Sequence, residues 1–414
     1  MVDLNALREA MGMMQHHDAI TGTEKQHVAN DYARQLQRGM NECEIITNAA
    51  ISKLLEVNIE LKTCPLLNVS QCTTTTTNDS FVVTIYNPLS RPVDKVVRLP
   101  VKEDSYSVND LQGTEYKTQI IPILDFIKNI PGRSSQVKNE LIFIARGIPA
   151  LGWKSYRVLV YRKTNKNIIT SKKGNKYSVK DTAFIIDPNT GLINSLTIKN
   201  VSIDLSQNFF YYNGFVGDNS KFESRSSGAY VFRPDGPLQK ITNKKVDYKV
   251  YEGELVAEIH QTLNEYIGRK LYYPVTTQIS IKDTENELAV LVDIAQGDTS
   301  LKDRNIELMV HRNCLHDDAF GVGEALNETA FGLGLVVRGS HYITVGNQLA
   351  ALTKDIVQRR LLDTWTFVVP VDEKVKHNME DLFTWCEIIS AQETTLGGNQ
   401  WLKDSHRLHF ETNR

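Results

Sequence analysis

The densest group of residues that could do chemistry lies near the start of the chain, where His16 and His17 directly precede Asp18. Imidazole nitrogens and carboxylate oxygens are normal zinc ligands, so this triplet is a candidate metal site. A tetrahedral site would need further ligands, because one His-His-Asp run cannot complete it. A hydrogen-bonded network at a helix end would satisfy the same polar groups without a metal. The spacing alone favours the network and leaves the metal site open.

The elements that must position this triplet are helical. Apolar side chains follow a 3-4-3 spacing typical of one helix face: Leu4, Leu7, Met11 and Met14. Asp18 continues that face. Gly22 interrupts the pattern, and Thr23 with Gln26 matches a capping box, which predicts a second helix. We expect residues 1–62 to be helical, as the remnant of a three-helix bundle.

Beyond a polar run at residues 73–77, predicted to be a linker, the hydrophobic period changes to that of strands. Five segments are rich in β-branched and aromatic residues or are bounded by turn residues: 81–86, 96–101, 118–123, 140–145 and 155–161. Their spacing predicts a small β-sandwich over residues 63–165.

Lysine and arginine gather between residues 162 and 176 among Asn, Ser and Gly. No aromatic side chain that could stack on a base lies between them, so we interpret the segment as a solvated linker and a domain boundary. Strand patterns then return at 184–186, 246–256, 276–281, 288–293, 306–310 and 341–345. They predict a large antiparallel β-sandwich domain over 177–414. The expected fold class is therefore mainly β with an N-terminal helical segment.

Charge and composition exclude some classes of partner. The formal net charge of -2 gives no drive toward nucleic acid or an anionic membrane. No run of about 18 apolar residues predicts a membrane-spanning helix. The first residues show no signal peptide, and we expect that the natural N-terminus is missing.

Cysteines and sequons favour a secretory origin. Four Asn-X-Ser/Thr sequons are candidate glycosylation sites: Asn68, Asn78, Asn200 and Asn327. Cys64 and Cys72 lie eight residues apart, a spacing that suits a small disulfide loop or a free buried pair.

The segment that contains the triplet resembles a signature of glycoside hydrolase family 38, in its lysosomal α-mannosidase branch. The stretch is His16-His17-Asp18-Ala19-Ile20-Thr21-Gly22-Thr23, with similarity continuing from His27 to Leu36. Further ordered matches are Cys64 to Cys72, Tyr86-Asn87-Pro88-Leu89, Ser227 to Pro234, Leu308 to Arg312 with Asp317-Asp318, and Gln392 to Leu396. A series in this order along the whole chain is highly specific.

The resemblance implies an α-mannosidase that removes terminal α-D-mannose from N-glycans in lysosomal glycoprotein catabolism, by a zinc-assisted retaining mechanism. It implies that His17 is a zinc ligand, that Asp18 binds mannose hydroxyls and that His16 supports them. Tyr230 and Arg312 would line the sugar site. By residue type alone, Tyr230 would instead pack in a sandwich.

The resemblance also implies a disulfide between Cys64 and Cys72. By residue type alone, Arg312 would form a salt bridge with Asp317 or Asp318 rather than face a sugar. The match to the family motif favours the site role for Arg312, as it does for Tyr230.

The sequence departs from the family pattern at three places. The family's nucleophile and its other three zinc ligands come from an N-terminal α/β domain, and no matching motif occurs here, so we expect neither catalytic carboxyl group in this chain. Asn313 stands where an arginine is expected. At 263–271 the chain is shorter than the family by several strands, roughly 70 residues from the usual spacing of strands and turns.

We therefore expect a chain that supplies part of an α-mannosidase active site and is inactive alone. Its expected partners are a mannose oligosaccharide and a separate N-terminal catalytic segment, and a homo-oligomer is compatible with the sequence. The alternative is a non-catalytic β-sandwich that binds carbohydrate or serves assembly. A nucleic-acid module built on 162–176 is disfavoured by the near-neutral charge.

Overall fold

A computed structural model describes residues 4–54, 61–161, 168–241, 244–262, 273–300 and 302–371. Its packing divides the chain into two compact units. The first contains Met1–Cys43, Ile130–Gly132 and Thr170–Arg360, and the second contains Glu44–Asn129, Arg133–Ile169 and Leu361–Arg414. The predicted domain boundaries at 62 and at 165–177 stay a prediction.

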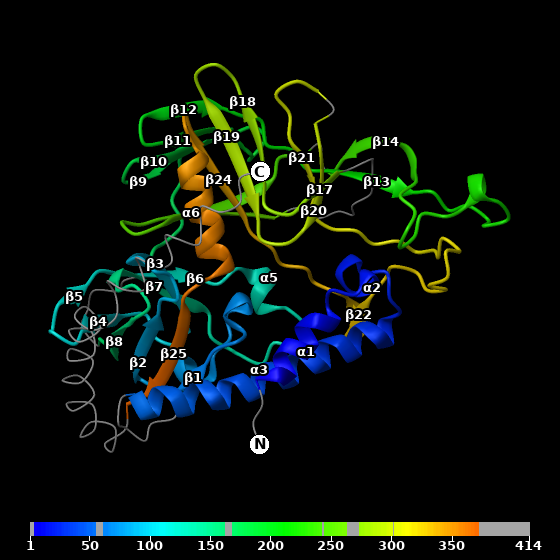
Figure 1. Cartoon of the computed structure of the whole chain (residues 1–414). Helices are drawn as coiled ribbons and strands as arrows, with labels where there is room; N and C mark the ends of the chain where they lie inside the picture. The colour runs from blue at the N-terminus through cyan, green and yellow to red at the C-terminus, as the bar shows by residue number, and fades with distance from the viewer. Residues whose placement is uncertain are drawn as a thin grey trace, which may run out of the picture. The chain divides into compact units, whose positions relative to one another are not determined.

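The N-terminal segment is helical, as the periodicity predicts. It forms α1 (Asn5–Met13), α2 (His17–Thr21) and α3 (Gln26–Leu54) (Figure 1). The capping box is wrong, because α3 begins only at Gln26 and the Thr23 hydroxyl donates a hydrogen bond to Asp18 instead. The predicted apolar face is only partly covered, since Leu4 and Met11 are exposed.

A glycine allows α1 and the first half of α3 to approach closely. A Cβ built on Gly39 would lie 2.7 Å from the Cα of Leu7 and 2.9 Å from its backbone nitrogen. Backbone atoms cannot move aside as a flexible side chain can, so any larger residue at 39 would push the two helices apart.

The second unit is a β-sandwich. One sheet has the order β1-β25-β2-β8-β4-β5, with the bounds Lys62–Thr63, Trp365–Pro370, Ser80–Tyr86, Trp153–Val160, Tyr106–Asp110 and Glu115–Tyr116. The other has the order β3-β7-β6, with the bounds Val93–Val101, Asn139–Ile148 and Thr118–Pro122. Inward side chains of both sheets form one core, among them Phe81, Val97, Phe143 and Tyr156. Successive residues of a strand point to opposite faces of its sheet, so buried and exposed side chains alternate. The buried faces of the two sheets therefore pack against each other.

The last described strand completes the larger sheet. β25 pairs antiparallel with both β1 and β2, and Figure 1 shows it in orange-red beside them. Local patterns predicted neither this pairing nor the short helix α4 (Thr73–Thr77), which replaces the expected polar linker. Thr75 in α4 is buried and donates its hydroxyl to the carbonyl of Pro100 at 2.6 Å. The remaining short elements of the unit are η1 (Leu67–Val69) and α5 (Asp125–Lys128).

The first unit carries, besides the helices, several small antiparallel sheets. One sheet has the order β12-β11-β10-β9, with the bounds Val201–Asp204, Ile193–Ile198, Thr182–Ile186 and Lys176–Val179. Two three-stranded sheets are β17-β20-β21 (Tyr273–Val275, Gln296–Thr299, Glu307–Met309) and β18-β19-β24 (Gln278–Lys282, Glu287–Val292, His341–Gly346). The two-stranded sheets are β13-β14 (Phe210–Gly214, Pro234–Lys240), β15-β16 (Asp247–Glu252, Ala257–Thr262) and β22-β23 (Thr329–Ala330, Leu333–Gly334).

The predicted fold class, mainly β with N-terminal helices, is confirmed. One helix inside the expected β region, α6 (Ala350–Leu361), was not predicted. The predicted shortening at 263–271, the family match at 392–396 and residues 162–167 of the lysine-rich segment lie outside the described residues. A short 3-10 helix, η2 (Phe222–Ser224), lies in the loop between β13 and β14.

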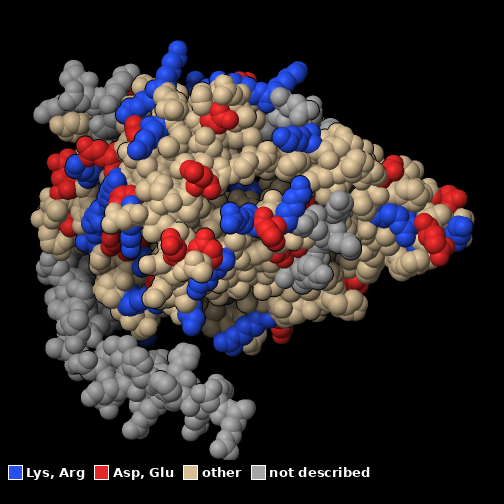
Figure 2. Space-filling model, turned by 90° about the horizontal axis from the view of Figure 1, so that it is seen from above, with Lys and Arg blue, Asp and Glu red and all other residues tan. Residues whose placement is uncertain are grey.

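Charged side chains of both signs lie on the face of the molecule drawn in Figure 2. Figure 2 shows acidic and basic side chains intermingled over the face in view, in keeping with the near-neutral net charge. No helix in the described part of the chain is both long and apolar enough to span a bilayer.

We predict that Gly39→Ala destabilises the helical pair by about 1–3 kcal/mol, the usual cost of overpacking. Amide hydrogen exchange within α1 measures it. Gly12→Ala is the matched control: Gly12 lies in α1 and its added Cβ would meet nothing within 4 Å. That control should stabilise α1, because alanine favours a helix over glycine. Equal protection in the two variants would contradict the close approach.

Candidate functional site

The candidate site begins at the break between α1 and α2. His16 precedes α2 in an extended conformation, with φ -55° and ψ 139°, so His17 and Asp18 open a new helical turn. α2 ends at Gly22, whose φ of 67° lies in the left-handed region that favours glycine. The chain then reverses, and the amide of Thr23 donates to the carbonyl of Asp18 at 3.0 Å.

Asp18 is the centre of the cluster. Its Oδ2 lies 3.4 Å from Nε2 of His16 and 3.7 Å from Nε2 of His17. Its Oδ1 accepts hydrogen bonds from the hydroxyl of Thr23 at 2.8 Å and from that of Tyr230 at 3.0 Å. The structure thus brings together four of the five residues that the resemblance implies for the sugar site and its metal.

The hydrogen bond from Thr23, followed by that from Tyr230, holds the pKa of the Asp18 carboxyl below its ordinary value of 3.8. The two imidazoles add a smaller effect in the same direction. Asp18 is therefore an ionised acceptor at neutral and mildly acidic pH. Its side chain is 30% exposed, so it can still receive hydroxyl donors from a ligand.

The same triplet is the only group of three potential metal ligands found among the described residues. One ligand atom from each of His16, His17 and Asp18 lies within 4.8 Å of the others. The side chain of His17 is 82% exposed, so its ring can turn toward an ion. The donor types fit zinc, but three ligands do not complete a closed tetrahedral site.

Tyr230 reaches the cluster from the loop between β13 and β14. The residue is 49% exposed and its ring packs against Phe320, with 5.9 Å between centroids. Asp318 holds its backbone, because the amides of Tyr230 and Val231 both donate to Asp318 Oδ2. The sequence suggested Asp318 as part of a family match and as a salt-bridge partner of Arg312, and no local pattern signals a contact that spans 88 residues.

Arg312 is the predicted site residue that the structure does not join to the cluster. Among the described residues, no hydrogen bond or ion pair links it to the triplet or to Tyr230, and its buried Nε and Nη2 have no hydrogen-bond partner. The alternative salt bridge is wrong, because the carboxylates of Asp317 and Asp318 accept backbone amides instead. The role of Arg312 in sugar binding stays a prediction.

A hollow of about 180 Å³ adjoins the cluster. Gly22 and Ala229, neighbours of Thr23 and Tyr230, line one part of it, and Val322 with residues 324–329 lines another. Three acidic residues are among those that line it, Glu24, Glu324 and Glu328, and Glu324 accepts the amide of Gln26 at 2.9 Å. The wall beside the cluster is thus rich in acceptors for hydroxyl groups.

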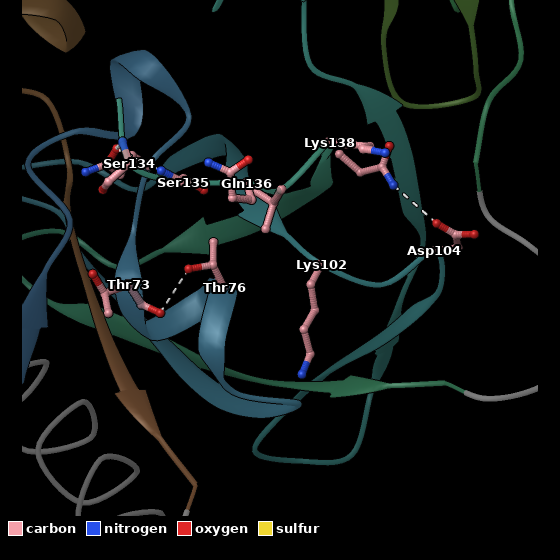
Figure 3. Close-up of a pocket in the computed structure, with 11 residues that line it drawn as sticks. Thr73, Thr76, Lys102, Asp104, Ser134, Ser135, Gln136 and Lys138 are labelled. Atoms are coloured by element: carbon pink, nitrogen blue, oxygen red, sulfur yellow. Dashed lines mark hydrogen bonds between the residues drawn. The ribbon is translucent and has the colours of Figure 1, made fainter. Parts of the chain in front are cut away.

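A larger hollow, of about 670 Å³, lies in the second unit. Figure 3 shows its lining of hydroxyl, amide and lysine side chains, including Thr73, Ser134 and Lys102. Lys102 pairs with Asp79 at 2.5 Å, and Asp104 accepts a hydrogen bond from Asn139 at 3.2 Å. This lining holds a single carboxyl group and no histidine, so it offers no acid–base pair for glycoside hydrolysis.

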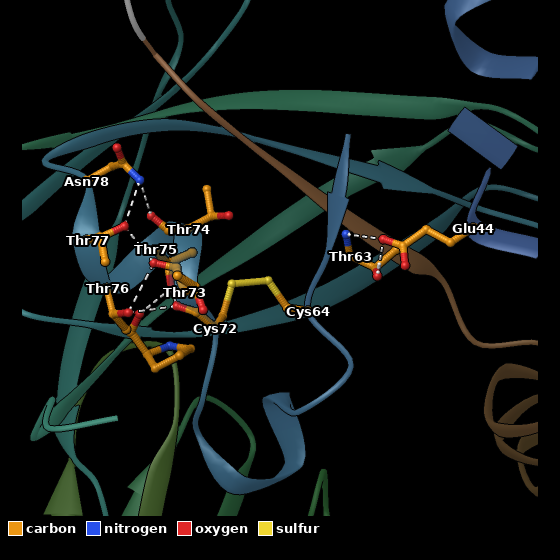
Figure 4. Close-up of a disulfide and its surroundings, with 11 residues drawn as sticks. Glu44, Thr63, Cys64, Cys72, Thr73, Thr74, Thr75, Thr76, Thr77 and Asn78 are labelled. Carbon is orange, nitrogen blue, oxygen red and sulfur yellow. Dashed lines mark hydrogen bonds between the residues drawn. A yellow bond between two sulfur atoms is a disulfide. The ribbon is translucent and has the colours of Figure 1, made fainter. Parts of the chain in front are cut away.

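A disulfide joins Cys64 to Cys72, the pair that the resemblance implies (Figure 4). The loop it closes is also held by Arg133, which donates to the carbonyl oxygens of Val69 and Ser70 at 2.9 Å each.

The four sequons differ in their surroundings. Asn68, Asn200 and Asn327 are exposed, whereas Asn78 is half-buried. Nδ2 of Asn78 donates to the carbonyl of Thr74 at 2.8 Å. A glycan is attached to this nitrogen, so the structure favours the other three sites, and glycosylation stays a prediction.

Three family profiles match separate parts of the chain. Residues 1–54 match the α-mannosidase middle domain, residues 117–158 match the lysosomal α-mannosidase-like central domain, and residues 182–272 match the glycosyl hydrolases family 38 C-terminal domain. The first of these regions contains the triplet and the third contains Tyr230.

Curated relatives agree with the profiles. The chain is 32% identical over 437 residues to the lysosomal α-mannosidase of Bos taurus, covering 87% of this chain and 42% of that protein. It is 28% identical over 553 residues to that of Homo sapiens, covering 99% of this chain and 54% of the relative. The chain thus spans about half the length of these relatives. The alignment with the human protein extends over 553 residues, which is more than the 414 of this chain. Within the aligned region the human protein therefore has residues that have no counterpart in this chain.

The fold also occurs in a solved structure, a protein in glycosyl hydrolase family 38 from Enterococcus faecalis. The TM-score is 0.52 at 12% identity, and the match covers 87% of this chain and 54% of that one. At this identity the likeness concerns the fold.

We predict that Gly22→Ala destabilises the α1–α2 region by about 1 kcal/mol, since a Cβ is disfavoured in the left-handed conformation. Nothing lies within 4 Å of that Cβ, so the backbone, not a clash, sets the cost. Gly22→Asn is the matched control, because asparagine tolerates this conformation. Hydrogen exchange of the Thr23 amide, which donates to Asp18, measures the effect. Equal exchange in the two variants would contradict the requirement for glycine.

Proposed function

Because the chain belongs to glycoside hydrolase family 38, whose middle and C-terminal domains it carries, we propose that it forms part of an α-mannosidase active site. Its substrate is a terminal α-D-mannose of an N-glycan. The observation that carries this proposal is the hydrogen bond from the Tyr230 hydroxyl to Asp18, which lies beside two histidines. Tyr230 and Asp18 are 212 residues apart in the sequence.

Asp18 and Tyr230 suit the binding of sugar hydroxyls. The Asp18 carboxylate has four lone-pair directions, of which two protein hydroxyls use those on Oδ1. Its Oδ2 remains within reach of a hydroxyl donor from mannose. The Tyr230 hydroxyl donates to Asp18 and keeps its own oxygen as an acceptor. Asp18 and Tyr230 thus offer two acceptor oxygens, to which the hydroxyl groups of a sugar can donate.

Zinc is the proposed cofactor, with His17 as a ligand and His16 as a supporting group. When bound, zinc would orient and polarise sugar oxygens. The exposed ring of His17 beside the Asp18 carboxylate supports this assignment. The remaining ligands would come from another segment.

The catalytic carboxyl groups, like the remaining zinc ligands, would come from another segment. A retaining glycosidase needs two of them about 5–5.5 Å apart, one as nucleophile and one as acid–base. The cluster offers Asp18 alone, and its ionised state is unsuited to a general acid. We therefore propose that this chain binds the sugar and that a separate catalytic segment supplies both groups.

The surface near the site is compatible with such a segment. Large apolar side chains are exposed on and around α1 and α2: Leu4, Met11, Met13 and Ile20. Exposed apolar side chains that gather in one region favour a contact with another protein surface.

A lysosomal location, reached through the secretory pathway, is proposed on two supports. The Cys64–Cys72 disulfide is typical of oxidising compartments, and three sequons are exposed. The lysosomal relatives named above agree with it.

A second candidate function is non-catalytic carbohydrate binding. It is favoured by the same observation, a cluster that can bind hydroxyl groups but contains one carboxylate. It differs from the first in needing no catalytic partner.

We predict that the purified chain with zinc binds methyl α-mannoside weakly and does not hydrolyse a chromogenic α-mannoside at acid or neutral pH. Tyr230→Phe should weaken binding roughly tenfold, because it removes a hydrogen bond to a charged group. Tyr342→Phe is the control, an exposed tyrosine of the same unit. Saturation-transfer NMR measures binding. Binding unchanged in Tyr230→Phe would overturn the site. Turnover lost on His17→Ala would mean that the chain contains its own nucleophile.

A separate measurement tests the metal. Titration of the metal-depleted chain with zinc in a calorimeter should show one weak site. His17→Ala should abolish it, since the lost imidazole is the proposed ligand. His27→Ala, an exposed histidine on α3, is the control and should leave it unchanged. Equal zinc binding by the two variants would contradict the assignment.

A further inference from the structure

Asp318 is a fully buried carboxylate that the proposed sugar chemistry does not use. Its residue exposure is 0%. Its Oδ2 accepts the amide of Tyr230 at 2.6 Å and that of Val231 at 2.7 Å, and its Oδ1 lies 3.4 Å from the amide of Phe320. Burial of a carboxylate is costly unless donors surround it, and here backbone amides are those donors.

No ion pair joins this carboxylate to a basic side chain among the described residues. The neighbouring guanidinium of Arg225 contacts backbone carbonyl oxygens instead, that of Asp318 at 3.4 Å and that of Ala319 at 2.7 Å. The carboxylate of Asp318 is therefore not one half of a salt bridge. Its contacts point to the Tyr230 backbone as the feature that it stabilises.

The two loops that meet at Asp318 are in direct backbone contact. A Cβ on Gly228 would lie 2.6 Å from the amide nitrogen of Asp318 and 2.7 Å from its Cβ. The amide of Gly228 also donates to the carbonyl of Val231 at 3.1 Å, which turns the chain around Tyr230. A residue larger than glycine would separate the amides from the carboxylate.

The loop that carries Asp318 is itself fixed by its neighbour. Asp317 accepts the amide of Ala319 at 2.9 Å and that of Gly323 at 3.1 Å. Its carbonyl accepts Nδ2 of Asn219 at 2.9 Å, which ties it back to the loop that precedes Tyr230. Two adjacent aspartates thus have different tasks: Asp317 shapes its own loop, and Asp318 reaches across to the other.

We propose that Asp318 is a positioning residue of the sugar site, which fixes the backbone of Tyr230 so that the phenol hydroxyl meets Asp18. The part that concerns sugar rests on the proposed function. Tyr230 needs such an anchor because the residue is half-exposed. Among the described residues, its ring contacts one aromatic ring, that of Phe320. A long side chain amplifies small backbone shifts at its tip, and a sugar site tolerates little displacement.

The test follows Tyr230 directly by fluorine NMR of the chain labelled with 3-fluorotyrosine. Tyr230→Phe identifies its resonance. Asp318→Ala should move that resonance to the position of a solvent-exposed fluorotyrosine, since both amides lose their acceptor. Asp318→Asn should keep it near the wild-type position, because its Oδ1 can accept the same two amides. Gly228→Ala should act like Asp318→Ala, although it leaves the carboxylate in place.

Each outcome bears on the proposal. A Tyr230 resonance unmoved in a folded Asp318→Ala chain, or moved equally in Asp318→Asn, would overturn it. If Asp318→Ala fails to fold, the resonance in Gly228→Ala decides. Addition of methyl α-mannoside separates this proposal from the proposed function. A sugar that leaves the wild-type Tyr230 resonance unchanged argues against the sugar site while the anchor stands. With both intact, Asp318→Ala should weaken mannoside binding roughly tenfold, as losses of supporting contacts do.

Discussion

The candidate site depends on one hydrogen bond, from the hydroxyl of Tyr230 to Asp18. It joins α2 to a loop of the first unit, and a glycine near each end shapes the backbone there. Gly22 reverses the chain after α2 so that Thr23 can donate to the same carboxylate. Gly228 lets the other loop lie against Asp318. Neither glycine takes part in chemistry, but both favour the backbone paths that let the donors converge.

Two carboxylates in this region illustrate how surroundings set a role. Asp18 is partly exposed and accepts hydroxyl donors, which lower the pKa of its carboxyl and keep it an acceptor for further hydroxyls. Asp318 is fully buried and its oxygens face backbone amides. The first has room for a ligand, and the second has none. The same residue type therefore serves binding at one position and positioning at the other.

The second unit is stabilised differently, by hydrogen-bonded strand pairing and by the hydrophobic core that its two sheets share. β25 is far from β1 and β2 in the sequence, yet it lies between them in the sheet. The disulfide and Arg133 hold the loop that follows β1. Polar side chains line the hollow beside this loop, so its surface differs from the acceptor-rich site of the first unit.

The sequence by itself determined the local structure: the N-terminal helices, most strands and the His16–Asp18 triplet. Helix and strand periods repeat within a few residues, so they can be read from neighbours. Only the tertiary structure decided that Tyr230 meets Asp18, that Asp318 anchors it and that Arg312 stands apart. It also decided the place of β25. These contacts join residues far apart in the chain, and loop closure and packing, which no local pattern records, select them.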